Sequence, residues 1–128
     1  MKAQRFYVCQ ICGNLVGMIY DSGMIPVCCG KPMTELKANT ADASLEKHVP
    51  VIDVSDSRVD VRIGESPHPM NADHWIQWIY LMTSHGGHRY ELLPGMSPHA
   101  SFSLQPGERP FAAFAYCNLH GLWKNEIS

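Results

Sequence analysis

The chain has 128 residues, 45% of them apolar, and a formal net charge of −2 with its histidines neutral. That length accommodates one ordinary domain, or one small domain beside a metal-held module, and the apolar share suffices for a packed core. The slightly acidic balance argues against a nucleic-acid partner and against a polybasic membrane anchor, so neither is expected.

Four cysteines within the first 30 residues predict a metal site built from thiolates. Cys9 and Cys12 form a C-x-x-C knuckle, and Cys28-Cys29 begins sixteen residues after Cys12. The first residues lack the apolar run of a secretory signal, so we expect a cytoplasmic location and metal binding rather than disulfides. Four thiolates make a tetrahedral pocket suited to iron or zinc. The adjacent pair differs from the second half of common zinc ribbons and favours iron, with a structural zinc clip as the alternative.

Residues 1–36 are predicted to form a compact, turn-rich domain. Short strands are expected at 5–8 and 15–20, with a turn at Gly13-Asn14 between them. A segment this short buries too little apolar surface to be stable alone, so a bound metal is expected to hold it together. Residues 37–45 lack periodicity and are predicted to be a linker or an arm across the second domain.

From residue 48 onward the pattern has the period of β-strands. Val59, Val61 and Ile63 alternate with Asp60 and Arg62, as in a strand with one buried face. Further strands are expected around 49–54 and at 74–83, 89–93, 100–104, 111–117 and 122–127. About seven short strands at this spacing predict an antiparallel β-sandwich, and no segment has the pattern of an amphipathic helix.

A second metal site is predicted from Cys117 and His120, which stand three residues apart in an aromatic segment. A soft thiolate and an imidazole can bind one transition metal together. Further candidate ligands at strand ends or tight turns are His48, His68 and His74. Taken singly, a lone cysteine is often a small buried side chain, and a lone histidine is usually a surface residue. That ordinary role is expected for His85, His88 and His99, with a hairpin turn at His85-Gly86-Gly87-His88.

These segments resemble, in order along the chain, the motifs of the desulfoferrodoxin family. Cys9-x-x-Cys12 with Cys28-Cys29-Gly30-x-Pro32-Met33 is similar to the desulforedoxin module. The motifs that resemble the superoxide reductase domain are Glu46-Lys47-His48-Val49-Pro50-Val51, His68-Pro69-Met70, His74-x-Ile76-x-Trp78-Ile79 and Tyr116-Cys117-Asn118-x-His120-Gly121-x-Trp123. The match runs from about Arg5 to Lys124, with no departure at a ligand position.

The resemblance implies a mainly β protein in three parts: a desulforedoxin-like iron domain at 1–36, a linker at 37–45 and an immunoglobulin-like β-sandwich at 46–128. It also implies two iron ions per chain. The first would be held by Cys9, Cys12, Cys28 and Cys29, and the second by His48, His68, His74 and His120 in one plane with Cys117 as the axial ligand. Glu46 corresponds to the sixth ligand of the oxidised centre, and Lys47 to a lysine that assists superoxide.

The implied activity is that of a superoxide reductase, which reduces superoxide by one electron to hydrogen peroxide. The electron would come from an external donor such as rubredoxin, and the protein would be a cytoplasmic homodimer. Residue types alone leave two alternatives open: a non-catalytic electron-transfer protein, and a zinc-stabilised metal-binding protein. They also allow Lys47 to be an ordinary solvated residue and Glu46 to be half of an exposed Glu-Lys pair.

Overall fold

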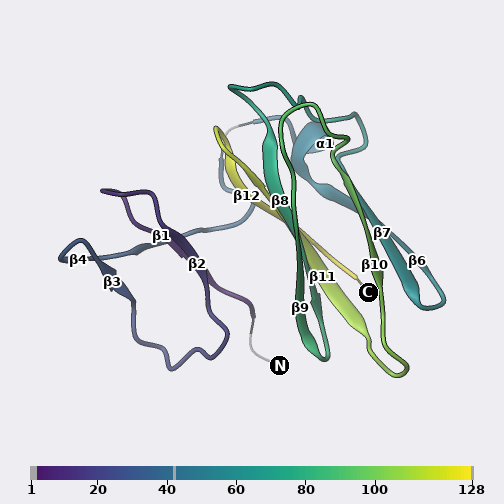
Figure 1. Ribbon diagram of the computed structural model, residues 1–128, viewed down its shortest axis with the longest axis horizontal. Coiled ribbons are helices and arrows are strands. Elements are labelled where there is room, and N and C mark those ends of the chain that lie inside the picture. The colour runs from purple at the N-terminus through teal and green to yellow at the C-terminus, as the bar shows by residue number, and fades with distance from the viewer. Residues whose placement is uncertain (1–2, 42, 128) are drawn as a thin grey trace. The chain divides into compact units, whose positions relative to one another are not determined.

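The computed structural model describes residues 3–41 and 43–127, and the chain divides into two compact units, 1–37 and 38–128 (Figure 1). Residue 42, in the expected linker, lies outside the described residues. The segment from residue 38 groups with the second unit, and hydrogen bonds of Asn39 show why. Its N–H donates to the Leu122 carbonyl (3.0 Å), while its side-chain amide bonds both the N–H (2.9 Å) and the carbonyl (3.1 Å) of Lys124.

The first unit is a small assembly of short strands. Its main sheet has the order β2-β1-β5, and a separate hairpin pairs β3 with β4. The strands are β1 (Phe6–Val8), β2 (Leu15–Gly17), β3 (Val27–Cys28), β4 (Lys31–Pro32) and β5 (Thr34–Glu35). The buried apolar cluster of this unit consists of Tyr7, Cys9 and Met33, with a few partly buried neighbours. So small a core agrees with a unit that depends on a metal for its stability.

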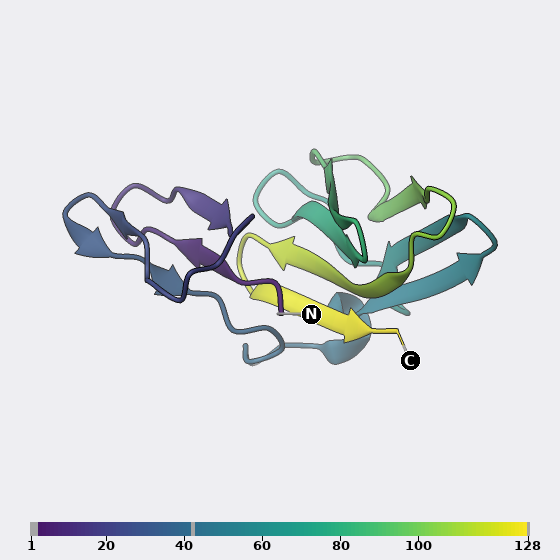
Figure 2. The ribbon, with the colours of Figure 1, turned by 90° about the horizontal axis from the view of Figure 1, so that it is seen from below.

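The second unit is a sandwich of two antiparallel sheets (Figures 1 and 2). One sheet has the order β10-β7-β6 and the other β12-β11-β8-β9, seven strands together, as in an immunoglobulin constant-type sandwich. The strands are β6 (Pro50–Ser55), β7 (Arg58–Ile63), β8 (Ile76–Thr83), β9 (Gly86–Glu91), β10 (His99–Ser103), β11 (Pro110–Cys117) and β12 (Gly121–Glu126). The predicted fold class, a small metal-binding unit followed by an antiparallel sandwich, is confirmed.

Helical structure is limited to one turn in the part of the chain that the structure describes. This helix, α1 (Leu45–His48), has four residues and ends at a buried histidine. Among the described residues, none of the helical structure is long and apolar enough to cross a bilayer.

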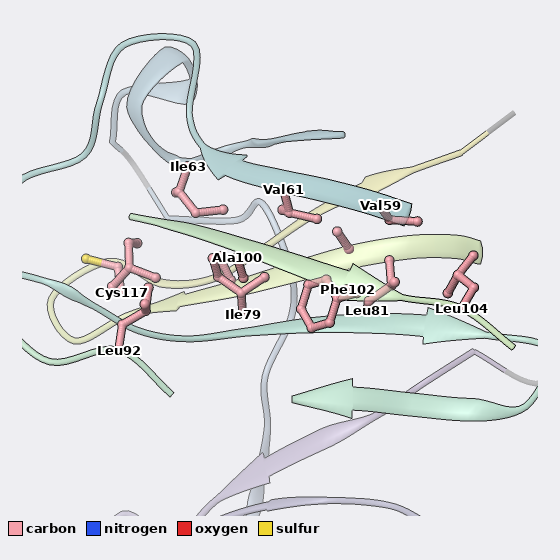
Figure 3. Close-up of a cluster of buried hydrophobic side chains, with 13 residues drawn as sticks. Val59, Val61, Ile63, Ile79, Leu81, Leu92, Ala100, Phe102, Leu104 and Cys117 are labelled. Atoms are coloured by element: carbon pink, nitrogen blue, oxygen red, sulfur yellow. The ribbon is translucent and has the colours of Figure 1, made fainter. Parts of the chain in front are cut away.

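The core lies between the two sheets and follows the alternation of the sequence. Val59 and Val61 of β7 are fully buried and face Ile79 and Leu81 of β8 across the interior (Figure 3). Cys117 lies at one end of this row of side chains, with its sulfur directed away from the others. The packed interior therefore fixes the end of β11, where the second candidate site begins.

The hairpin between β8 and β9 turns two residues earlier than predicted. Thr83 pairs with Gly86, so Ser84-His85 is the turn and both glycines belong to β9. A Cβ atom on Gly87 would lie 1.7 Å from the Tyr80 hydroxyl oxygen. The glycine is thus needed because the Tyr80 ring lies across the neighbouring strand, not because the chain turns there.

A buried carboxylate ties this hairpin to the turn between β10 and β11. Glu108 accepts hydrogen bonds from the Thr83 hydroxyl, from the Gln105 N–H (2.9 Å) and from His88 Nε2 (2.7 Å). These donors hold the pKa of Glu108 at about 2. His88, expected at the surface, is thus half-buried and hydrogen-bonded to Glu108, whereas His85 and His99 are exposed as predicted.

Replacing Glu108 with glutamine is expected to lower the free energy of unfolding at pH 7 by about 1–3 kcal/mol, because charge-assisted hydrogen bonds are lost. The folded pKa of about 2 lies below the ordinary value of 4.5, so this stabilisation is present above pH 4.5 and is lost as the pH falls toward 2. Chemical denaturation at pH 7 and pH 3 should show the difference between wild type and variant narrowing in acid. The exposed Glu126→Gln is the control, and an equal loss in both variants would contradict the prediction.

Two candidate metal centres

The four cysteines of the first unit converge. The sulfurs of Cys9, Cys12, Cys28 and Cys29 all lie within 4.8 Å of one another. The Cys12 and Cys28 sulfurs are 3.6 Å apart, and those of Cys28 and Cys29 are 4.0 Å apart. A tetrahedral site with metal–sulfur bonds of about 2.3 Å separates its sulfurs by about 3.8 Å. The group therefore has the spacing of a tetrathiolate metal site.

Backbone conformation explains how two consecutive cysteines point into one site. Side chains of successive strand residues normally point to opposite faces. Here β3 and β4 form a tight hairpin in which Cys28 pairs with Lys31, so Cys29 and Gly30 are its two turn residues. Both have positive φ, 53° and 75°, as a type I′ turn requires. The left-handed conformation of Cys29 turns its sulfur back toward that of Cys28.

The surroundings of the cluster shift the pKa values of Cys9 and Cys29 in opposite directions. The N–H groups of Cys12 and Ile11 lower the pKa of Cys9 to about 6, whereas the neighbouring sulfurs, Cys12 first, raise the pKa of Cys29 to about 12. All four are free of disulfides. Thiolates this close repel one another, and a bound cation removes that repulsion. Four soft donors around one point fit iron or zinc.

The predicted ligands of the second unit also converge. Nitrogen atoms of His48, His74 and His120 and the sulfur of Cys117 lie within 4.8 Å of one another. The His68 ring adjoins this group through His48. In chain order the five residues are His48, His68, His74, Cys117 and His120. They come from the end of α1, the loop after β7, the segment before β8, the end of β11 and the turn before β12. One end of the sandwich thus gathers five candidate ligands that are distant in sequence.

The four imidazoles are arranged in a closed cycle. Neighbouring rings, in the order His48, His68, His74 and His120, have centroids 4.5, 4.7, 5.2 and 5.0 Å apart and lie at 78–85° to one another. His48 Nε2 is 3.1 Å from His68 Nε2 and 3.2 Å from His120 Nδ1. Two nitrogens bound at right angles, each about 2.1 Å from a metal, lie about 3.0 Å apart. The spacing therefore fits adjacent positions around one ion.

The tautomers of two of these rings are set by main-chain carbonyls. His48 Nδ1 donates to the Ser44 carbonyl and His68 Nδ1 to the Pro69 carbonyl, both at 2.6 Å. Their Nε2 atoms consequently present lone pairs to each other, an arrangement that a cation between them stabilises. Burial lowers the pKa of His68 to about 4 and also lowers that of His48, so both rings are neutral at pH 7. The buried Nε2 of His74 has no hydrogen-bond partner among the described residues, which also fits a metal ligand.

Cys117 supplies the sulfur of this group. The residue is fully buried, and its Sγ lies 3.9 Å from His120 Nδ1. Burial raises the pKa of the Cys117 thiol, while the N–H groups of His120 and Leu119 lower it. A bound cation favours the thiolate form, as it does for any coordinating thiol. The donor set is thus four nitrogens and one sulfur, which suits a transition metal.

Glu46 and Lys47 stand on the exposed side of α1, directly before His48. The Glu46 carboxylate is not among the grouped ligand atoms of the described residues. The backbone of this turn is fixed, since Ser66 N–H donates to the Glu46 carbonyl (3.0 Å) and a Cβ on Gly64 would lie 2.4 Å from that oxygen. Glycine at 64 therefore permits the turn that carries both side chains to pack closely against the loop after β7.

Two residues of the C-terminal motif have contacts that could not be predicted from their residue types. Trp123 is fully buried, stacks on His48 with centroids 4.7 Å apart, and donates its Nε1–H to the His120 carbonyl (3.1 Å). Asn118 hydrogen-bonds the main chain on both sides of His74. Their place within the segment from Tyr116 to Trp123 was the available signal, but it did not indicate what they touch.

Comparison with known proteins shows similarity over nearly the whole chain. A model of the Desulfoferrodoxin family matches residues 40–126. The desulfoferrodoxin of Syntrophotalea carbinolica is 46% identical over 94% of each chain, and that of Nitratidesulfovibrio vulgaris is 42% identical over 95% of each. The crystal structure of the superoxide reductase from Treponema pallidum superposes with a TM-score of 0.82 at 31% identity, covering 97% of this chain and 99% of that one.

Proposed function

The chain belongs to the desulfoferrodoxin family, and from this membership we propose that it is a superoxide reductase with two iron centres. The reaction combines one superoxide, one electron and two protons into one hydrogen peroxide, so it needs an external electron donor and releases no oxygen. The observation that carries the proposal is the cycle of four imidazoles closed by one buried thiol.

The residues that would hold the iron ions follow from the two groups. The first ion would be bound by Cys9, Cys12, Cys28 and Cys29, and the second by His48, His68, His74, His120 and Cys117. Iron bound in the second group supplies the electron that superoxide accepts. We assign the first group to a domain at 1–36 and the second to a domain at 46–128, with a linker at 37–45.

The protein's own groups prepare this site for a small anion. Neutral imidazoles and one thiolate leave a ferrous ion with net positive charge, which favours an anionic ligand. The exposed Lys47 adds a positive charge beside His48 and increases the local concentration of superoxide. Five ligands would leave a sixth position on the iron for superoxide. In the oxidised protein Glu46, on the same turn, would occupy that position. The protons come from water at the exposed side of α1.

We assign a rubredoxin-type electron donor, a homodimer and a cytoplasmic location. The first unit supports a dimer because four large apolar side chains within nine residues are at least 66% exposed: Ile19, Tyr20, Met24 and Val27. Exposed apolar clusters of this kind mark protein–protein contacts. The cytoplasmic assignment rests on thiols that bind metal rather than form disulfides.

Pulse radiolysis of the reduced, iron-loaded protein tests the function. Superoxide should disappear rapidly, with one hydrogen peroxide formed per iron oxidised in the second centre and no oxygen released. A slow reaction would favour an electron-transfer protein with closed sites, and a colourless protein containing zinc would favour a structural metal-binding protein.

Replacing Lys47 with glutamine in the same experiment is expected to slow the bimolecular reaction by about tenfold, because one steering charge beside the site is lost. The dependence of the rate on ionic strength should weaken as well. Lys31→Gln, at an exposed lysine of the first unit, is the matched control. An unchanged rate for the Lys47 variant, or an equal loss in both, would remove Lys47 from the mechanism.

A further inference from the structure

The backbone of His74 is held along both of its edges. On one edge, the Asn71 N–H donates to the His74 carbonyl (2.9 Å) and the His74 N–H donates to the Asn71 carbonyl (3.1 Å). On the other edge, Asn118 Oδ1 accepts the Trp75 N–H (2.9 Å) and Asn118 Nδ2 donates to the Asp73 carbonyl (3.0 Å). In an extended chain the N–H and the carbonyl of one residue point to one edge. The carbonyl of the residue before it and the N–H of the residue after it point to the other edge. The Asn118 amide therefore occupies the place of a neighbouring strand.

This contact connects three of the candidate ligands. Asn118 follows Cys117 directly, precedes His120 by two residues, and its own N–H donates to the Trp75 carbonyl (3.3 Å). Three hydrogen bonds thus join the turn that carries two ligands to the segment that carries a third. A displacement of either segment would change the separation between His74 and the sulfur.

His74 depends on this support more than its neighbours do. The rings of His48 and His68 are oriented by hydrogen bonds from Nδ1 to main-chain carbonyls. Among the described residues, by contrast, no hydrogen bond from Nδ1 orients the His74 ring, and its buried Nε2 is left for a metal. The position of this imidazole is therefore set largely by the backbone to which it is attached, and Asn118 holds that backbone.

We propose that Asn118 is a positioning residue, whose side-chain amide sets the place of His74 relative to Cys117 and His120 and thereby the affinity of the second centre for iron. The proposal rests on the proposed function, since it takes these three residues as iron ligands. Removing a hydrogen-bond partner that orients a ligand typically lowers metal affinity by about 10- to 100-fold.

The test compares the full-length protein with Asn118→Ala, Asn118→Asp and a matched control. The control is Asn39→Ala, because the Asn39 amide also accepts one main-chain N–H and donates to one main-chain carbonyl, but both belong to Lys124, which neither is a ligand nor adjoins one. Ferrous iron is removed anaerobically with a competing chelator, the absorption band of the oxidised second centre is recorded, and amide exchange of Trp75 is measured on the zinc-loaded protein.

Asn118→Ala should bind iron in the second centre about 10- to 100-fold more weakly, with a shifted absorption band and faster exchange of the Trp75 amide. Asn118→Asp keeps the acceptor for Trp75 N–H but places an oxygen against the Asp73 carbonyl, so it should also lose affinity. Asn39→Ala should match the wild type in affinity and absorption band.

Unchanged affinity and absorption in both Asn118 variants would overturn the proposal, and so would an equal loss of affinity in Asn39→Ala. If Asn118→Ala fails to fold, Asn118→Asp decides by the same measurements. The outcomes are separable from the proposed function: a wild-type protein that binds iron in this site but does not react with superoxide refutes the function alone.

Discussion

Replacing Cys117 with serine is expected to abolish the thiolate-to-iron absorption of the second centre and to slow superoxide reduction by at least about a hundredfold. Loss of a group that only orients a ligand already costs up to about a hundredfold, and here the ligand itself is lost. Cys117 is the one sulfur in this group and is fully buried, so solvent cannot substitute for it as a donor. A serine hydroxyl is a harder and weaker donor that remains protonated. Visible spectroscopy and pulse radiolysis measure the two effects.

The control for this variant is Tyr116→Phe, one residue earlier in β11. Tyr116 stacks on Trp78 with ring centroids 5.7 Å apart, a contact that phenylalanine retains. Both the absorption and the rate should be preserved in this control. A Cys117→Ser protein that keeps its charge-transfer band would show that the sulfur does not bind the metal.

Replacing Cys9 with serine is expected to unfold residues 1–37 while leaving the second unit folded. The buried cluster of the first unit is built around Tyr7, Cys9 and Met33, and Cys9 itself is a proposed ligand. Binding of a structural metal by such ligand sets contributes about 10–16 kcal/mol to folding, far more than so small a core supplies. Removal of the metal with a chelator should have the same effect.

Amide hydrogen exchange measured by NMR distinguishes the units. In Cys9→Ser the amides of β1 and β2 should lose protection, whereas those of β8 and β11 should keep it. Val16→Ala trims a partly buried side chain against the same cluster and is expected to cost only about 1–2 kcal/mol without unfolding the unit. Wild-type protection of β1 in Cys9→Ser would show that the metal is not required for the fold.

Strand β7 was predictable because one of its faces is buried and the other is largely exposed. Val59, Val61 and Ile63 are all buried in β7, as their alternation with Asp60 and Arg62 indicated. The turn between β8 and β9 was misplaced because Gly86-Gly87 is a strong local turn signal. Gly87 is needed for a different reason, namely its contact with Tyr80 on the neighbouring strand. A contact between strands cannot be recognised from the local sequence.

The candidate sites were predictable in residue type but not in geometry. Cys9, Cys12 and the cysteine pair converge as the spacing suggested, the first two from the loop between β1 and β2 and the pair from the short hairpin of β3 and β4. His48 and His120 are separated by 72 residues, and their approach to 3.2 Å depends on the whole sandwich. Glu46 and Lys47 stay predictions, since both are exposed and make their proposed contacts only with superoxide or iron.

The orientation of two proposed ligand rings depends on main-chain oxygens, at Ser44 and Pro69, rather than on side chains. Every residue type carries such an oxygen, so the identity of these two positions can drift during evolution without loss of the hydrogen bond. Insertions or deletions have the opposite effect, because they move the oxygen itself. The length of these two segments, more than their composition, is therefore what natural selection is expected to preserve.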